Sequence, residues 1–321
     1  SVRAFDYQVY IVTAMYAHDK PVVGGSFPDQ LGSPWGRSSV FSPSSVAIAD
    51  TGCDSGVATG FIDLLRKKRP GFSLSNHFGP LRRFGTPLMQ LHYYGDLSKF
   101  NIISDPEHIR PDKRMWERTV RVATKHGGQM WGPGSYPHRI IESIKDVSHY
   151  YPELVVLSEQ SGPDINDPIT QEAFKSISDL ARRFRTYIVI GGISSDGAPS
   201  NVYVWDKDGQ IMGYASRTWD GMGSRAFEVF ELDFGVIGIK VCGDLHWPSI
   251  DRALALKGAE IIVDPSQMWG PNGAFNQLLA QVRSYDNGVW TICSHWAKSD
   301  PSLRSYIIDP FGVPIATTRY Q

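Results

Sequence analysis

Hydrophobic runs and helical patterns alternate along the second half of the chain. One unbroken apolar run ends in Glu159 and another leads into Cys242, and such runs are typical of strands buried on both faces. Between them, residues 168–185 repeat apolar side chains every three or four positions, which predicts an amphipathic helix. The same reasoning predicts strands at 119–124, 152–159, 187–193, 201–205, 211–215, 227–232, 236–241 and 259–265, and helices at 139–147 and 249–258. Strands that alternate with helices indicate an α/β layered fold.

The beginning of the chain repeats part of its end. Residues 2–17 align with 282–297 at an offset of 280, and Val, Arg, Asp, Val and Ala are identical. Residues 37–51 align with 304–318 at an offset of 267, with seven of fifteen positions identical. Two matches in the same order indicate duplication of one unit, and each copy is predicted to contain a helix end followed by three strands. Residues 71–117 show little periodicity and are interpreted as an extended tail or linker.

Composition narrows the class of protein. Of the 321 residues, 41% are hydrophobic and 20% charged, which suits a sizeable core and argues against bulk disorder. A net charge of −1 gives no reason to expect a nucleic-acid or membrane partner. Three cysteines suit a reducing compartment better than a disulfide framework, and no run approaches the roughly 20 apolar residues of a membrane helix. With no secretory signal at the start of the sequence, we expect a cytoplasmic protein.

Cys242 occupies the corner between the predicted strand 236–241 and the helix that follows. A thiolate is favoured near a helix N-terminus, yet free cysteine is also among the most buried residue types, so the pattern alone leaves both interpretations open. Lys240 lies two residues earlier, and strand periodicity predicts that it points to the same face. Lys240 is therefore a candidate cation beside the thiol, with an ion pair to a nearby acid as the alternative.

Several ordered blocks resemble those of the carbon–nitrogen hydrolase (nitrilase) superfamily. They comprise the run that ends in Glu159, residues 213–218, the Cys242 block from 241 to 260, and a closing block from 283 to 312. The resemblance covers residues 118–321. It implies a four-layer αββα sandwich and a catalytic site built from a glutamate, a lysine and a cysteine.

The same resemblance assigns roles and domains. It implies that Glu159 is a general base and Cys242 a nucleophile, while the position of the family lysine is occupied by Arg217. Arginine stabilises negative charge but does not donate a proton at ordinary pH. By the repeat, residues 1–117 contain the closing half of a second nitrilase-like domain and a linker, and residues 118–321 form a domain that lacks its last strand.

Two functions follow as expectations. The first is hydrolysis of a small-molecule amide or nitrile through a Cys242 thioester; the alternative is a non-catalytic structural or regulatory module, because Arg217 replaces the family lysine. His246 and Trp247 are candidate substrate contacts, and Trp247 is one of several tryptophans that suit either an acyl pocket or a core. No cofactor or metal is expected, since His and Cys are too sparse near any one point for a zinc site. The family resemblance also suggests a homo-oligomer or pairing of tandem domains.

Overall fold

The computed structural model describes residues 11–13, 39–41, 47–50, 119–125, 138–159, 164–195, 198–218, 225, 227–267, 273–295 and 304–318. The chain divides into two compact units, Ser1–Gly95 and Asp96–Gln321. The domain boundary predicted between residues 117 and 118, and the linker predicted at 71–117, lie outside the described residues.

Two sheets form the centre of the second unit. The first has the order β4-β5-β6-β7-β8, in which β4, β5 and β6 are parallel and β7 and β8 antiparallel. The second has the order β14-β13-β12-β11-β10-β9, in which β10, β11 and β12 are parallel and the outer strands antiparallel. The strands of the first sheet are β4 (Val122–Thr124), β5 (Leu154–Glu159), β6 (Tyr187–Ser195), β7 (Ala198–Trp205) and β8 (Ile211–Ser216). Those of the second are β9 (Val229–Leu232), β10 (Gly235–Ile239), β11 (Ile261–Ser266), β12 (Trp290–His295), β13 (Tyr306–Ile308) and β14 (Pro314–Thr317).

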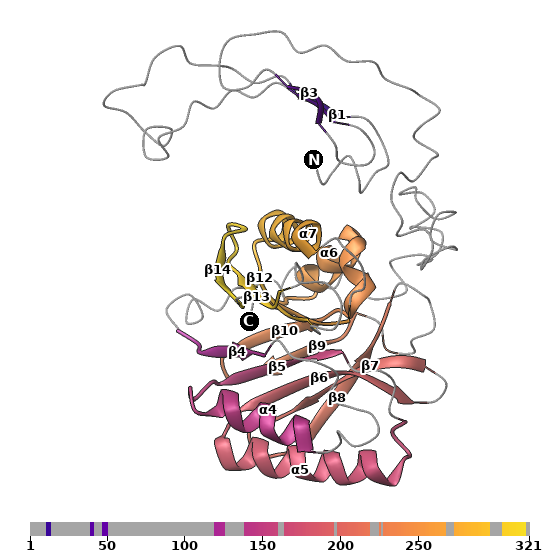
Figure 1. The fold of residues 1–321 in the computed structure, drawn as a ribbon, viewed down its shortest axis with the longest axis vertical. Coiled ribbons are helices and arrows are strands. Elements are labelled where there is room, and N and C mark those ends of the chain that lie inside the picture. The colour runs from indigo at the N-terminus through magenta and orange to yellow at the C-terminus, as the bar shows by residue number, and fades with distance from the viewer. Residues whose placement is uncertain are drawn as a thin grey trace. The chain divides into compact units, whose positions relative to one another are not determined.

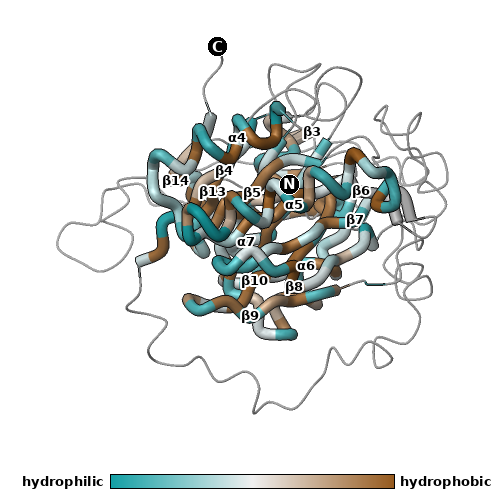
Figure 2. The backbone as a smooth tube through the Cα atoms, turned by 90° about the horizontal axis from the view of Figure 1, so that it is seen from below, coloured by the Kyte–Doolittle hydropathy of each residue, from teal (hydrophilic) through white to brown (hydrophobic). Residues whose placement is uncertain are grey.

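Helices cover the outer face of each sheet. The first sheet carries α4 (His138–Ser148) and α5 (Pro168–Phe184), and the second carries α6 (Pro248–Leu256) and α7 (Gly273–Asn287) (Figure 1). One apolar core joins α4 and α5 to the first sheet, and a second core lies between the sheets. Hydrophobic colour accordingly concentrates on the central strands in Figure 2, whereas the helices alternate. The unit therefore has the αββα layering expected from the family resemblance.

Local sequence explains where the longest helix begins and ends. The Asp167 side chain accepts a hydrogen bond from the Ile169 N–H, and Pro168 occupies the first helical position, where no N–H is needed. Arg185 takes a left-handed conformation and ends the helix. The helix predicted over 168–185 is therefore present with nearly the same bounds. None of the helices among the described residues is long and apolar enough to cross a bilayer.

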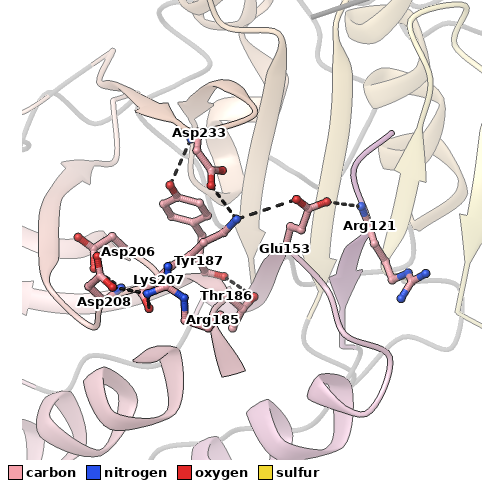
Figure 3. Close-up of polar contacts among 9 residues, drawn as sticks. All are labelled: Arg121, Glu153, Arg185, Thr186, Tyr187, Asp206, Lys207, Asp208 and Asp233. Carbon is pink, nitrogen blue, oxygen red and sulfur yellow. Dashed lines mark hydrogen bonds and ion pairs between the residues drawn. The ribbon is translucent and has the colours of Figure 1, made fainter. Parts of the chain in front are cut away.

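Lys207 links the two sheets through ion pairs at the edge where β5 and β6 begin. Its ammonium lies 2.9 Å from Asp233 Oδ2, 3.9 Å from Glu153 Oε1 and over the ring of Tyr187 (Figure 3). The Tyr187 hydroxyl in turn accepts the Asp233 N–H. Glu159 ends β5, so the Lys207 ion pairs lie at the opposite end of that strand.

The first unit contains a three-stranded antiparallel sheet in the order β1-β2-β3. Its strands are β1 (Ile11–Thr13), β2 (Ser39–Phe41) and β3 (Ala47–Asp50). They coincide with β12, β13 and β14 at the two sequence offsets of the repeat. Val12 pairs with Val40 as Ile292 pairs with Ile307, and the register shift after Val40 recurs after Ile307. The two sets of three strands thus share strand order, register and irregularity.

Candidate active site

Three residues predicted from the sequence meet at one end of the sandwich. Glu159 is the last residue of β5, Arg217 directly follows β8, and Cys242 begins the short 3₁₀ helix η7 (Cys242–His246) after β10. The Cys242 thiol hydrogen-bonds the Glu159 carboxylate, and Arg217 Nη1 lies 3.5 Å from Glu159 Oε1. The Glu159 carboxylate therefore contacts both a guanidinium and a thiol.

The Glu159 carboxylate is buried, with 5% of the residue exposed. Ser200 Oγ donates a hydrogen bond of 2.6 Å to Glu159 Oε1. Burial raises the pKa of Glu159, while the Ser200 hydrogen bond and the Arg217 charge act in the opposite direction. Burial and the donors around Glu159 thus have opposite effects on its pKa.

Cys242 lies on a sharp backbone elbow rather than on the preceding strand. Its φ is 51°, a left-handed value that is uncommon for a side chain other than glycine. Asp264 Oδ1 accepts the Cys242 N–H at 2.9 Å, and Asp244 Oδ2 accepts the Val241 N–H at 3.0 Å. Two carboxylates therefore fix the elbow, and it presents the thiol to Glu159.

The resting protonation of the thiol follows from its surroundings. Burial raises the pKa of Cys242 well above its usual value, and the Glu159 carboxylate raises it further. The sulfur therefore carries its proton at neutral pH and has a base within hydrogen-bonding reach.

Ser200 was not predicted from the sequence. Besides bonding Glu159, it accepts the Arg217 N–H with its backbone carbonyl at 3.1 Å, so it anchors both charged residues. It lies in β7, one position before the predicted strand 201–205. A single serine at a strand edge carries no distinctive pattern, and only the pairing of β6 with β7 places it beside Glu159.

Lys240 adopts one of the two environments considered for it from the sequence. Its ammonium forms a 2.6 Å ion pair with Asp251 Oδ1 of α6, and both residues are fully buried. Strand alternation does not extend to Cys242, because β10 ends at Ile239 and the chain turns at the elbow. The structure therefore matches the alternative of an ion pair with a nearby acid.

His246 and Trp247 pack against the interior. The ring nitrogens of His246 are buried, and burial together with the Arg283 and Lys240 charges lowers the pKa of His246 to about 4. His246 is therefore neutral at physiological pH. Trp247 is 8% exposed and lies directly before α6. The other tryptophans considered for an acyl pocket, Trp131, Trp219, Trp269 and Trp296, lie outside the described residues. No group of three or more metal-binding side chains occurs in the described part of the chain.

Comparisons with known proteins identify the family of this chain. The family profile described as carbon-nitrogen hydrolase matches residues 131–320. A probable nitrilase of Schizosaccharomyces pombe is 26% identical over 205 residues, covering 56% of this chain and 73% of the relative. A nitrilase of Pyrococcus abyssi is 28% identical over 182 residues, covering 50% and 68%.

Solved structures give the same fold. An amidase from Nesterenkonia sp. AN1 superimposes with a TM-score of 0.54 at 16% identity, covering 63% of this chain and 90% of that chain. The family profile spans more than half of the chain and contains the buried glutamate and the elbow cysteine. This protein belongs to the carbon-nitrogen hydrolase family.

Proposed function

We propose that the second unit hydrolyses a non-peptide carbon–nitrogen bond of a small amide or nitrile, with Cys242 as nucleophile and Glu159 as general base. The observation that carries this proposal is the buried Glu159 carboxylate in contact with both the Cys242 thiol and the Arg217 guanidinium. Relatives named nitrilase and amidase support the choice of reaction class.

The first half of the reaction forms a thioester. As Cys242 Sγ bonds to the substrate carbonyl carbon, its proton passes to Glu159 and the carbonyl electron pair moves to oxygen. We assign Arg217 as the cation that stabilises this oxyanion. Collapse of the adduct breaks the C–N bond, and Glu159 gives the proton to the leaving nitrogen. A nitrile would give a thioimidate at the same stage.

The second half releases the acid. The Glu159 carboxylate takes a proton from water, and the resulting hydroxide adds to the thioester carbon. The C–S bond then breaks, and the sulfur recovers the proton from Glu159. Both halves require Glu159 to alternate between its charged and neutral forms, and its raised pKa reduces the cost of the neutral form.

Arg217 decides between this function and a non-catalytic module. A guanidinium stabilises an oxyanion but, unlike a lysine ammonium, does not lose its proton near neutral pH. Under the proposed function, Arg217→Lys lowers turnover or changes it little. A site that has lost its chemistry through this replacement would instead gain weak amidase activity in Arg217→Lys.

The test is a screen of small amides and nitriles with the 321-residue chain and Cys242→Ala. We expect turnover in the unaltered chain and at least a 10³-fold loss, to order of magnitude, in Cys242→Ala. Cys293→Ala is a control, because Cys293 is the other described cysteine and Glu159 is not among the groups that influence it. Turnover that survives Cys242→Ala would rule out the mechanism.

We also propose a domain organisation. Residues 1–117 would contain the closing half of a second carbon-nitrogen hydrolase domain and the linker at 71–117, followed by the domain at 118–321. The shared register and irregularity of β1-β2-β3 and β12-β13-β14 support this proposal. The remaining strands of that second domain would come from the same polypeptide or from another chain.

A further inference from the structure

A buried carboxylate lies behind the nucleophile and takes no part in the proposed chemistry. Asp264 is the fourth residue of β11 and is fully buried. Its Oδ1 accepts the Cys242 N–H at 2.9 Å, whereas its Oδ2 is buried without a hydrogen-bond partner among the described residues. Burying a carboxylate in this way is costly, so its position requires a physical reason.

The backbone that Asp264 holds is itself unfavourable. Cys242 adopts a φ of 51°, a left-handed conformation that is unfavourable for a residue other than glycine. A charge-assisted hydrogen bond to the N–H of the same residue is strong enough to offset that cost. No other residue described at the elbow accepts this N–H.

We propose that Asp264 is a positioning residue, whose carboxylate fixes the Cys242 elbow and so aims the thiol at Glu159. This inference rests on the proposed function only for the reason why the thiol should face Glu159. The hydrogen bond and the elbow geometry are independent of that function. Among the described residues, Asp264 hydrogen-bonds to neither Glu159 nor Arg217, so it acts through Cys242.

The charges around Asp264 fit this role. Burial raises the pKa of Asp264 to about 7, and the Lys240 ammonium opposes the rise. The ion pair with Asp251 thus holds the Lys240 ammonium where its charge acts on Asp264. The ionisable groups that influence Asp264, or that it influences, are Lys240, Asp251, Glu159, Cys242, Cys293 and Tyr306. When ionised, Asp264 also raises the pKa of the Cys242 thiol.

The experiment measures the rate at which iodoacetamide alkylates Cys242 between pH 6 and 10, followed by mass spectrometry of the Cys242 peptide. Alkylation needs no turnover, so the result is independent of whether the chain hydrolyses amides. The variants are Asp264→Asn, which keeps an acceptor oxygen and removes the charge, and Asp264→Leu, which removes both. Glu260→Gln is the matched control, because Glu260 precedes the same strand and accepts the Val236 N–H at 3.2 Å.

We expect Asp264→Asn to shift the profile to lower pH and to speed alkylation at pH 8 by about threefold, since a negative charge beside the thiol is removed. In Asp264→Leu, the rate of Cys242 alkylation should no longer follow the pH profile of the unaltered chain, because the elbow relaxes and the thiol leaves Glu159. Glu260→Gln should behave as the unaltered chain. Equal profiles in Asp264→Asn and Asp264→Leu would overturn the proposal, because the acceptor would then have no role.

A second readout covers the case in which Asp264→Leu does not fold. Asp264→Asn alone must shift the profile while Glu260→Gln does not; an unshifted Asp264→Asn overturns the proposal. If a substrate is found, Asp264→Leu should lower kcat more than it changes KM. Absence of turnover in the unaltered chain, together with the predicted alkylation shifts, would refute the proposed function and leave the positioning role intact.

Discussion

Glu159 shows how much of a site depends on the surroundings of one residue. An exposed glutamate would be a weak base at neutral pH, and a buried one without partners would remain protonated. Here burial raises its pKa, while Ser200 and Arg217 restrain that rise. The pKa of Glu159 is thus set by opposing effects, beside a thiol that does not ionise by itself.

Ser200→Ala tests this balance. Loss of the 2.6 Å hydrogen bond removes a contribution that lowers the pKa of Glu159, so that pKa should rise. A bond worth about 1 kcal/mol corresponds to about 0.7 pH units. The base form then disappears at a higher pH, so activity at pH 6 falls more than activity at pH 8. A pH profile of kcat/KM checks the shift.

The control for this variant is Ser216→Ala. Ser216 is also buried, and its hydroxyl donates a hydrogen bond of 2.8 Å to Asn201 Oδ1 without touching Glu159. Removal of the Ser216 hydroxyl should change stability without shifting the acidic side of the kcat/KM profile. Identical profiles for Ser200→Ala and the unaltered chain would show that the serine does not tune the base.

At the scale of elements, the site depends on how closely the two sheets approach. Gly191 of β6 is the register partner of Glu159 in β5. A Cβ at Gly191 would lie 2.6 Å from Pro265 Cβ of β11, which belongs to the facing sheet. Because a Cβ moves only with its backbone, glycine at 191 permits the spacing at which Glu159 and Cys242 meet.

Gly191→Ala should therefore separate the sheets at the catalytic end. We expect a loss of about 1–3 kcal/mol in unfolding free energy and a slower thiol–base reaction, measured by urea unfolding and by Cys242 alkylation. Gly238→Ala is the comparison, since its Cβ would meet Ala259 Cβ at 2.9 Å on the α6 side of β10. It should lower stability similarly but leave Cys242 reactivity nearly unchanged. A Gly191→Ala protein with unaltered stability would contradict this account.

The whole molecule raises the question of the repeated unit. Val12 of β1 is 65% exposed, whereas its counterpart Ile292 of β12 is 1% exposed and belongs to the core between the sheets. If residues 1–75 close a second sandwich, Val12 occupies a core position whose covering sheet comes from elsewhere.

A matched pair of substitutions examines this. In the 321-residue chain, Ile292→Asp should abolish cooperative unfolding of the second unit, because it buries a charge. Val12→Asp should change the melting temperature little there. In a protein that includes the remaining strands, Val12→Asp should lower stability. The intact mass of the protein isolated from its source, or the proteins that co-purify with it, should reveal those strands. An independent cooperative fold of residues 1–117 alone would refute the duplication.

The sequence by itself determined much of the framework. Apolar runs and helical spacing located the elements of the second unit, since period and burial are properties of consecutive residues. The family blocks predicted Glu159, Arg217 and Cys242 as site residues, and the two offsets of the repeat predicted strands where β1, β2 and β3 lie. Each of these signals is local or compares one stretch of chain with another.

Only the tertiary structure decided which groups support the site. Ser200 reaches Glu159 through strand pairing, Asp264 reaches Cys242 from the neighbouring strand, and Lys240 turns to Asp251 instead of the thiol. The partner of a buried polar group is set by lateral packing and by a turn that breaks strand alternation. Neither leaves a periodic trace in the sequence, so these residues became visible only when the layers were assembled.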